Sequence, residues 1–395
     1  MGLYNYDSTE IPKSDRIPKL VENLYAKMPE IEAARAELIT ESFKATEGQP
    51  VVMRKARAFE HILKNLPIII RPEELIVGST TIAPRGCQTY PEFSYEWLES
   101  EFETVETRSA DPFYISDETK KRLLAADAYW KGKTTSELAT SYMAPEAIKA
   151  IEHNIFTPGN YFYNGVGHVT VKYWEVLETG FEGIMEKAQK ELDGCSVGDG
   201  NYARKSHFLE AVILSCKAVI DYAGRYAKLA QEMAAQTSDP VRKQELFVIA
   251  ENCSRVPAKG AQNFYEACQS FWFVQQLLQM ESSGHSISPG RFDQYMYPYY
   301  MKDINEGKIT KEDALELLTC LWIKTLTINK VRSQSHTLSS AGSPMYQNVT
   351  IGGQTTDKKD AVNKLSFVVL QSVAQTRLTP VSYTHLRAHE TSAHL

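Results

Sequence analysis

The sequence predicts an α/β protein that is predominantly helical, and three observations support that class. Most segments repeat apolar residues every three or four positions, which places them on one face of an α-helix. Strand-like segments are few, and the clearest are "ELIVGST" (74–80) and "QNVTIGGQ" (347–354), which are rich in β-branched residues. The length of 395 residues favours two domains or one large α/β unit.

The expected helices share good helix-forming residues and an apolar stripe. In chain order they cover 18–46, 50–66, 203–236, 239–256, 263–280 and 310–328. Asp239 is a candidate N-cap for the helix that Pro240 begins. Thr310 and Asp313 form an approximate capping box. The helix at 263–280 is apolar nearly all round, so we expect it to be buried on every side.

Composition excludes several classes of function. The net charge is −6 and no basic stripe stands out, so we expect no nucleic-acid partner. No run approaches eighteen apolar residues, so we expect no membrane span, and the start has no apolar segment typical of a secretory signal. None of the six cysteines forms a Cys-x-x-Cys pair, so we expect no zinc or other metal site. Cys216, Cys268 and Cys320 lie in apolar helical patterns typical of buried thiols, and this usage favours a cytoplasmic location.

One polar stretch, "ESSGHSISPGRFDQYMYPYY" (281–300), follows the apolar helix directly. It combines an imidazole and several hydroxyl groups with flanking aromatic residues. A surface loop would explain the polarity but not the aromatic residues, whereas a lined pocket explains both. The stretch therefore indicates a binding site for a small molecule.

Several segments together resemble the glycyl radical enzymes, the family of pyruvate formate-lyase and its dehydratase relatives. The resemblance is carried by "PEELIVGSTT", "GVGHVTVKYWEVLETGFEGI", "IAENCSRVPAKGAQNFYEACQSFWFVQ", "ESSGHSISPGRFDQYMYPYY", and "NVTIGGQ" with "VAQTRLT". These motifs occur in the family's order over roughly 12–379. The resemblance implies a ten-stranded barrel of two antiparallel five-stranded halves, wrapped in helices. We expect residues 12–380 to form the N-terminal part of this α/β barrel, a truncated pyruvate formate-lyase-like domain.

The resemblance implies three site residues. In the dehydratase branch, which acts on glycerol and 1,2-propanediol, a His-Ser pair contacts the substrate hydroxyls and a second histidine approaches from another side. The matching residues are His285 with Ser286, and His168 in "GVGHVTVKY". We expect His168 and His285 to be catalytic and Ser286 to bind substrate. Loss of a hydroxyl group needs a proton at the leaving oxygen, which an imidazole can supply near neutral pH.

Other polar residues of the stretch have structural interpretations. Without the resemblance, His168 would be a core histidine, and His285 and Ser286 would form a turn. For Arg291 and Asp293 we favour an ion pair or a cap of the next helix. The nearby tyrosines are expected to pack with their hydroxyl groups satisfied at the rim; they are Tyr295, Tyr297, Tyr299 and Tyr300.

The radical machinery of the family is not found in these 395 residues. The family carries a glycyl radical in an Arg-x-x-Gly-[Tyr/Phe] motif and passes it to a cysteine, with a glutamate two residues later in the dehydratases. Neither motif occurs here, so we expect no cofactor bound in this chain and no activity from it alone. The resemblance also implies a radical-SAM activating enzyme as partner and a homodimer when the protein is full length.

Three functional hypotheses remain. The first is part of a dehydratase that eliminates water from a small diol or polyol by thiyl-radical hydrogen abstraction. The second is another glycyl radical reaction: formate C-acetyltransferase, or a lyase or dehydratase of choline, trans-4-hydroxyproline or a sulfonate. The third is a non-catalytic helical scaffold derived from the fold. The polar His-Ser pair favours hydroxyl-bearing substrates over quaternary amines, which call for an aromatic cavity.

The last residues depart from the family at Pro380–Val381. The segment 381–395, "VSYTHLRAHETSAHL", resembles the read-through of a transposase sequencing adapter, so we interpret it as a non-native tail. It contains His385, His389 and His394, and the first two are spaced to share a helix face. We nevertheless predict no metal site there, because a foreign tail was never selected to bind.

Overall fold

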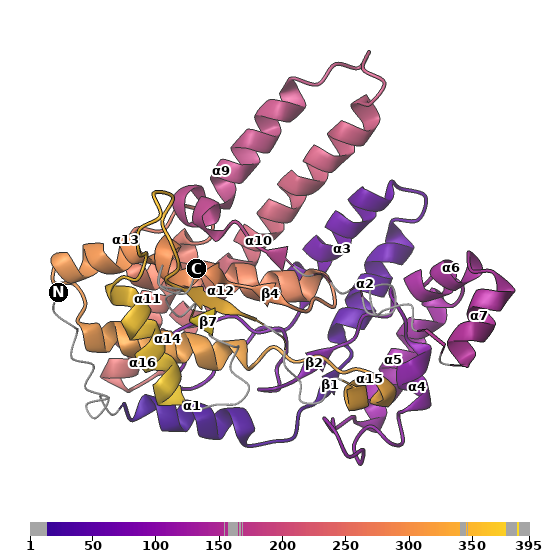
Figure 1. Cartoon of the computed structure of the whole chain (residues 1–395), viewed down its shortest axis with the longest axis horizontal. Coiled ribbons are helices and arrows are strands. Elements are labelled where there is room, and N and C mark those ends of the chain that lie inside the picture. The colour runs from indigo at the N-terminus through magenta and orange to yellow at the C-terminus, as the bar shows by residue number, and fades with distance from the viewer. Residues whose placement is uncertain are drawn as a thin grey trace.

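The computed structural model describes residues 14–153, 155–156, 165, 167, 169–339, 345, 347–376 and 385–386. This part of the chain is predominantly helical, as predicted (Figure 1). Its helices are α1 (Arg16–Tyr25), α2 (Ala34–Ala45), α3 (Val51–Asn65), α4 (Glu96–Ser100), α5 (Asp117–Trp130), α6 (Thr135–Ser141), α7 (Pro145–Glu152), α9 (Tyr173–Asp193), α10 (Tyr202–Gln236), α11 (Pro240–Arg255), α12 (Phe264–Glu281), α13 (Phe292–Asn305), α14 (Lys311–Thr325), α15 (Gln334–Ser339) and α16 (Lys364–Thr376). None of these helices is long and apolar enough to cross a membrane.

The strands are short, and within the described chain every ladder between them is parallel. They are β1 (Ile31–Glu32), β2 (Cys87–Gln88), β3 (Val169–Thr170), β4 (Ile287–Ser288), β5 (Gly290–Arg291), β6 (Val349–Ile351) and β7 (His385–Leu386). β1 pairs with β2, β3 pairs with β4, and β5, β6 and β7 form a three-stranded sheet in that order. Only Pro289 separates β4 from β5. One continuous stretch therefore pairs with β3 through β4 and with β6 through β5.

Most helix predictions are confirmed, including their starts. The Asp239 carboxylate accepts hydrogen bonds from the backbone N–H groups of Val241 and Arg242 at the start of α11. Thr310 and Asp313 form a complete capping box at the start of α14. The capping side chains satisfy N–H groups that have no partner within the helix, so the local sequence alone fixes these boundaries.

The prediction of one helix over 18–46 is wrong. The structure divides this range into α1, the short strand β1 and α2. Pro29 explains the break, because a proline ring disfavours helical geometry at the preceding residue. The residues after it extend and pair, with Ile31 opposite Cys87 in β2.

The prediction of a strand in "ELIVGST" that ends at Gly78 is also wrong. This segment is buried and contains bends at 75, 76 and 80, and it has no strand beside it in the described chain. Side chains bind its backbone instead: Gln269 bonds both the N–H and the C=O of Val77, at 2.9 and 2.8 Å. Tyr226 accepts the N–H of Ser79 at 3.0 Å. The β-branched pattern favoured a strand, but tertiary contacts decide whether such a segment finds a strand to pair with.

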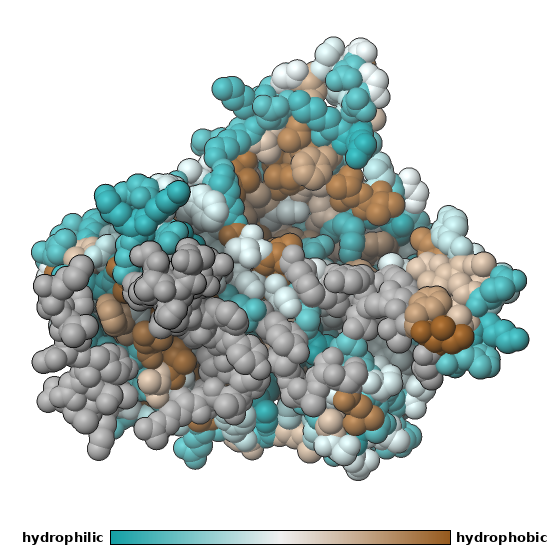
Figure 2. Space-filling view, viewed as in Figure 1, coloured by the Kyte–Doolittle hydropathy of each residue, from teal (hydrophilic) through white to brown (hydrophobic). Residues whose placement is uncertain are grey.

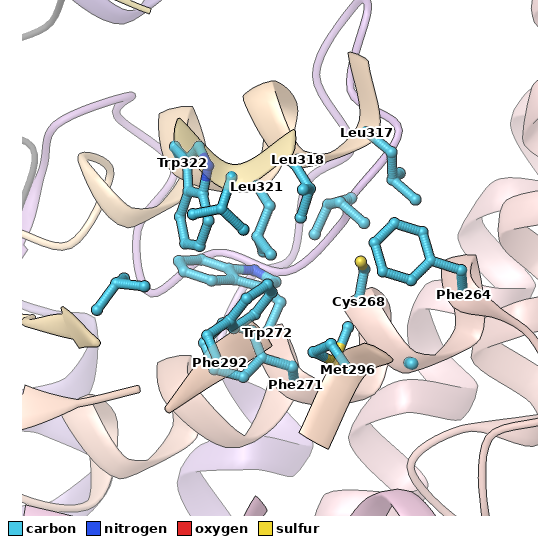
Figure 3. Packing of buried hydrophobic residues seen from close by; sticks show 14 of the residues in the cluster. Phe264, Cys268, Phe271, Trp272, Phe292, Met296, Leu317, Leu318, Leu321 and Trp322 are labelled. Carbon is cyan, nitrogen blue, oxygen red and sulfur yellow. The ribbon is translucent and has the colours of Figure 1, made fainter. Parts of the chain in front are cut away.

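Helix α12 lies at the centre of the core and is buried on nearly every side, as predicted. Figure 3 shows Phe271 and Trp272 of α12 packed against Phe292 of α13 and Trp322 of α14. The rings of Phe292 and Trp322 meet edge to face with centroids 5.2 Å apart. A second cluster, built on α3, α10 and α11, covers the opposite side of α12. Because α12 is held on both sides, the start of the polar stretch that follows it is also fixed in position.

Candidate functional site

The predicted His-Ser pair lies in the connection 282–286 between α12 and β4, which we call the His285–Ser286 turn. Ser286 has a φ of +59°, in the left-handed region that L-residues rarely adopt. Its backbone N–H donates to the carbonyl of Met345 at 2.9 Å, and its hydroxyl group lies 3.1 Å from Nδ1 of His285. Both side chains are half-buried. Backbone strain of this kind costs on the order of 1–3 kcal/mol and occurs preferentially at functional sites.

The register of β3 and β4 brings the two predicted motifs together. Val169 is the Cα partner of Ile287, and Thr170 is the partner of Ser288. Ile287 directly follows Ser286, and Val169 is the residue that follows His168 in the sequence. His168 itself lies outside the described residues, so its predicted role remains a prediction. The segments that carry the two histidines are nevertheless neighbours in one parallel ladder.

Two buried cations hold the C-terminal end of α12, from which the turn begins. Arg35 donates to the carbonyl oxygens of Met280 at 2.8 Å and Glu281 at 3.3 Å. Lys330 donates to the carbonyl oxygen of Gln279 at 2.6 Å. A helix C-terminus carries partial negative charge and unpaired carbonyl groups, so cations stabilise it. Burial, together with the nearby charge of Arg35, lowers the pKa of Lys330 well below its usual value.

Arg35 is neutralised by Glu92 rather than by the helix alone. The two side chains are almost completely buried, and Nη2 of Arg35 lies 2.6 Å from Oε1 of Glu92. Burial alone would raise the pKa of Glu92, but the charge of Arg35 holds it below its usual value. Sequence reasoning missed Arg35, Glu92 and Lys330. The only available signal was the presence of charged residues within apolar patterns, which does not reveal what they contact.

The prediction that Arg291 and Asp293 form an ion pair or cap the next helix is wrong: no side chain caps the start of α13, and both residues bond the segment after β6 instead. Asp293 accepts the backbone N–H of Gly352 at 2.7 Å, and Arg291 donates to the carbonyl oxygen of the same residue at 2.8 Å. Gly352 and Gly353 both have positive φ, +67° and +83°. A side chain at Gly352 would bring its Cβ within 2.9 Å of Val362. Positive φ favours glycine at both positions, and the two charged residues hold the end of β6.

All four tyrosines of the stretch pack in or against the core, and the hydroxyl groups of Tyr295 and Tyr299 are bonded, as predicted. The Tyr295 hydroxyl group donates to the carbonyl oxygen of Pro289 at 2.9 Å. That of Tyr299 donates to Leu177 at 2.9 Å. Tyr300 is buried against Phe264, with ring centroids 5.6 Å apart. The aromatic half of the stretch therefore belongs to the core beneath the turn.

Five of the six cysteines are buried, and we interpret these five as structural. Cys216, Cys268 and Cys320 are buried free thiols, as predicted, and so are Cys87 and Cys253. Burial raises the pKa of Cys216 to about 11, which makes its thiolate scarce at neutral pH. In the part of the chain that the structure describes, no group of three His, Cys, Asp or Glu side chains is placed to hold a metal ion.

A separate apolar groove of about 530 Å³ lies between α3, α9, α10 and α12. α9 and α10 project from the body of the molecule as a helical pair, and Figure 2 shows the hydrophobic surface between this pair and α3. Its lining includes Phe59, Phe181, Phe208, Val212 and Leu278. Neither His285 nor Ser286 lines the groove, so it is distinct from the candidate site.

Comparison with known proteins identifies the family. A family described as "Pyruvate formate lyase-like" matches residues 9–393. The chain belongs to this family. Members of the family are glycyl radical lyases and dehydratases. The expected resemblance, including its dehydratase branch, is therefore confirmed, whereas the proposed foreign tail at 381–395, most of which lies inside the matched range, stays a prediction.

Two solved structures share the fold closely. One describes 1,2-propanediol dehydration in Roseburia inulinivorans, with 69% identity and a TM-score of 0.92, over 95% of this chain and 45% of that chain. The other is the glycerol-bound B12-independent glycerol dehydratase from Clostridium butyricum, with 51% identity and a TM-score of 0.90, over 93% of this chain and 46% of that one. Among curated proteins, (2S)-3-sulfopropanediol dehydratase of Klebsiella oxytoca is 35% identical over 95% of this chain and 46% of its own length. The chain therefore spans about half the length of the relatives it matches.

Proposed function

We propose that this chain is part of a glycyl radical dehydratase that eliminates water from a small diol or polyol of the glycerol or 1,2-propanediol type. The observation that supports this most directly is the in-register pairing of β3 with β4, which makes neighbours of the segments after His168 and Ser286. The identities of 69% and 51% to structures concerned with 1,2-propanediol and glycerol support the same substrate class.

In this proposal the glycyl radical, once installed, would supply the chemistry that removes a hydrogen atom from one hydroxyl-bearing carbon of the substrate. The residues of this chain supply orientation and a proton. Ser286 holds a substrate hydroxyl group, and His285 or His168 protonates the adjacent hydroxyl group, which leaves as water. The retained hydroxyl group then gives up its proton, which restores the protonated imidazole, and return of a hydrogen atom to the carbon that lost water completes an aldehyde. The apolar and aromatic surroundings shield the radical intermediate from water.

The second candidate is a sulfonate lyase. Isethionate sulfite-lyase of Oleidesulfovibrio alaskensis is 37% identical over 95% of this chain and 46% of its own length. The remaining hypotheses were formate C-acetyltransferase, a choline lyase, trans-4-hydroxyproline dehydratase and a non-catalytic scaffold. No contact in the described chain favours one of these over a diol dehydratase. We also propose the radical-SAM activating enzyme as partner and a homodimer of the complete protein in the cytoplasm.

The proposal is tested with the complete protein, obtained by reading across the position of residue 381 in the source DNA. After activation, we expect aldehyde from 1,2-propanediol or glycerol, measured by coupling to an alcohol dehydrogenase. Isethionate serves as the competing substrate, with sulfite release as its readout. Sulfite from isethionate without aldehyde from either diol would replace the proposal by the second candidate.

A further inference from the structure

A single buried amide, that of Gln275, connects the segments around the candidate site. Gln275 lies on α12 and is completely buried. Its Nε2 donates to the carbonyl oxygen of Ile287 and to Oε1 of Gln347, both at 2.8 Å. Its Oε1 accepts a hydrogen bond from the hydroxyl group of Tyr173. Both amide hydrogens are therefore used, so the side chain is held in one orientation.

The three partners belong to three different segments. Ile287 is the first residue of β4 and directly follows the His285–Ser286 turn. Tyr173 is the first residue of α9, three positions after the end of β3. Gln347 lies two residues before β6. One side chain thus bonds the segments next to β3, β4 and β6 from the helix behind them.

Each partner is itself held in place. Gln347 passes the network on, because its Nε2 donates to the carbonyl oxygen of Thr325 at the end of α14, at 3.0 Å. The ring of Tyr173 packs against Phe271 and Tyr295, with centroid distances of 4.8 and 5.7 Å. Because the network is buried and every connection is directional, a change at its centre displaces several strands at once.

We propose that Gln275 is a positioning residue that fixes the position of the His285–Ser286 turn relative to β3. The inference rests on the proposed dehydratase function, in which hydrogen-atom and proton transfers need a fixed substrate. Gln275 holds Ile287, the residue between the turn and the rest of β4, and so fixes the turn from its C-terminal side. A displacement of about 1 Å at a reacting group can lower a rate by about 10²-fold.

Gln276 provides a matched control. It lies next to Gln275 on α12 and is equally buried, but its Nε2 donates to the hydroxyl group of Tyr222 of α10, at 2.7 Å, which is not a partner of Gln275. Methionine has a similar length and no hydrogen-bonding amide, so Gln275→Met and Gln276→Met remove comparable buried polar groups. Both substitutions are expected to lower the thermal midpoint. Only Gln275→Met is expected to disturb the site.

The first measurement is hydrogen exchange on the chain itself, which does not depend on activity. Gln275→Met should accelerate exchange at residues 284–290 and 345–351, including the Ser286 N–H that bonds Met345. Gln276→Met should instead affect the segment near Gly78, which lies against its side chain. Equal exchange of 284–290 in the wild type and Gln275→Met would overturn the positioning role, whatever the reaction is.

The second measurement is steady-state kinetics on the activated complete protein. Gln275→Met should lower kcat by about 10- to 100-fold with KM changed less than about 3-fold, because binding groups remain and orientation is lost. Gln276→Met should stay within about 2-fold of the wild type. Tyr173→Phe, which removes one of the three bonds, should fall between them. If the wild type dehydrates no diol, the proposed function fails while the exchange result stands; if both glutamine variants lose kcat equally, the positioning inference fails.

Discussion

The turn at His285 and Ser286 combines strain, partial burial and two hydrogen-bonding groups in adjacent residues. The positive φ of Ser286 is maintained because its N–H is bonded to Met345 and because α12 and β4 fix both ends. At this scale the sequence named the residues, since imidazole and hydroxyl groups after an apolar helix are unusual. It did not indicate the strain, which depends on Met345, a residue far along the chain.

Replacing either predicted catalytic histidine should affect turnover rather than the radical. In the activated complete protein, His285→Ala and His168→Ala should each lower kcat by about 10²- to 10⁴-fold, the usual contribution of a general acid. The glycyl radical signal, measured by electron paramagnetic resonance, should persist. Loss of the signal in both variants would indicate misfolding and would remove support for a catalytic role.

Asp127 of α5 gives a prediction about pH. Burial, with help from the charges of Glu99 and Glu96, raises the pKa of this carboxyl group to about 8. The folded protein therefore keeps the proton up to about pH 8, whereas the unfolded chain loses it near pH 4. Folding binds a proton in this window, so stability falls as pH rises from about 4 to 8.

The test compares the wild type with Asp127→Asn in denaturant titrations at pH 5 and pH 8. Asparagine keeps the shape without the ionisation, so the stability of the variant relative to the wild type should increase between these two pH values by a few kcal/mol, about 1.4 per unit of pH. A difference that does not change with pH would show that Asp127 ionises in the folded protein as it does in water.

Helix α12 controls the site at the scale of elements. Its two faces pack against different hydrophobic clusters, and its C-terminal carbonyl groups are bonded by Arg35 and Lys330. The helix therefore has little freedom to slide or rotate, and the turn that follows it starts from a fixed point. The sequence predicted this burial, because the helix is apolar nearly all round. The cations that hold its end come from α2 and from residue 330, and no local pattern connects them with α12.

Removing Arg35 should be costly because Glu92 would remain buried and unpaired. Arg35→Met is expected to lower the free energy of unfolding by about 3–5 kcal/mol, measured by denaturant titration. The double variant Arg35→Met, Glu92→Leu should recover part of this loss. Arg122→Met on α5 breaks the more exposed pair between Arg122 and Glu37 of α2, and should cost less than about 1 kcal/mol. Equal losses from both single variants would contradict the burial argument.

At the scale of the whole molecule, the chain matches 44–48% of the length of its relatives. Its parallel ladders are short, and β7 pairs with β6 at His385–Leu386. The apolar groove beside α9 and α10 is a surface that favours association in an isolated chain. The origin of the segment 381–395 bears on this directly. Amplification across its junction from the source DNA decides it: an intact reading frame through these residues into further family sequence would show that the tail is native.

Incubated with a radical-SAM activating enzyme, the 395-residue chain should give no glycyl radical doublet in electron paramagnetic resonance. The physical reason is that none of its glycines lies in the Arg-x-x-Gly-[Tyr/Phe] motif that presents the radical in the family. The complete protein, treated in parallel, is the positive control. A doublet from the chain alone would contradict the interpretation that its radical machinery lies elsewhere.

The sequence by itself determined the helical class, the caps at Asp239 and Thr310, the burial of 263–280, the glycine pair of β6 and the family. Each of these depends on residues close together in the chain or on the order of motifs. Only the tertiary structure decided that 74–80 bonds to Gln269 and Tyr226 instead of a strand, that Arg35 and Lys330 hold α12, and that Gln275 joins three segments. Buried polar groups must find partners wherever the fold provides them. Those partners are distant in sequence, so no local pattern predicts them.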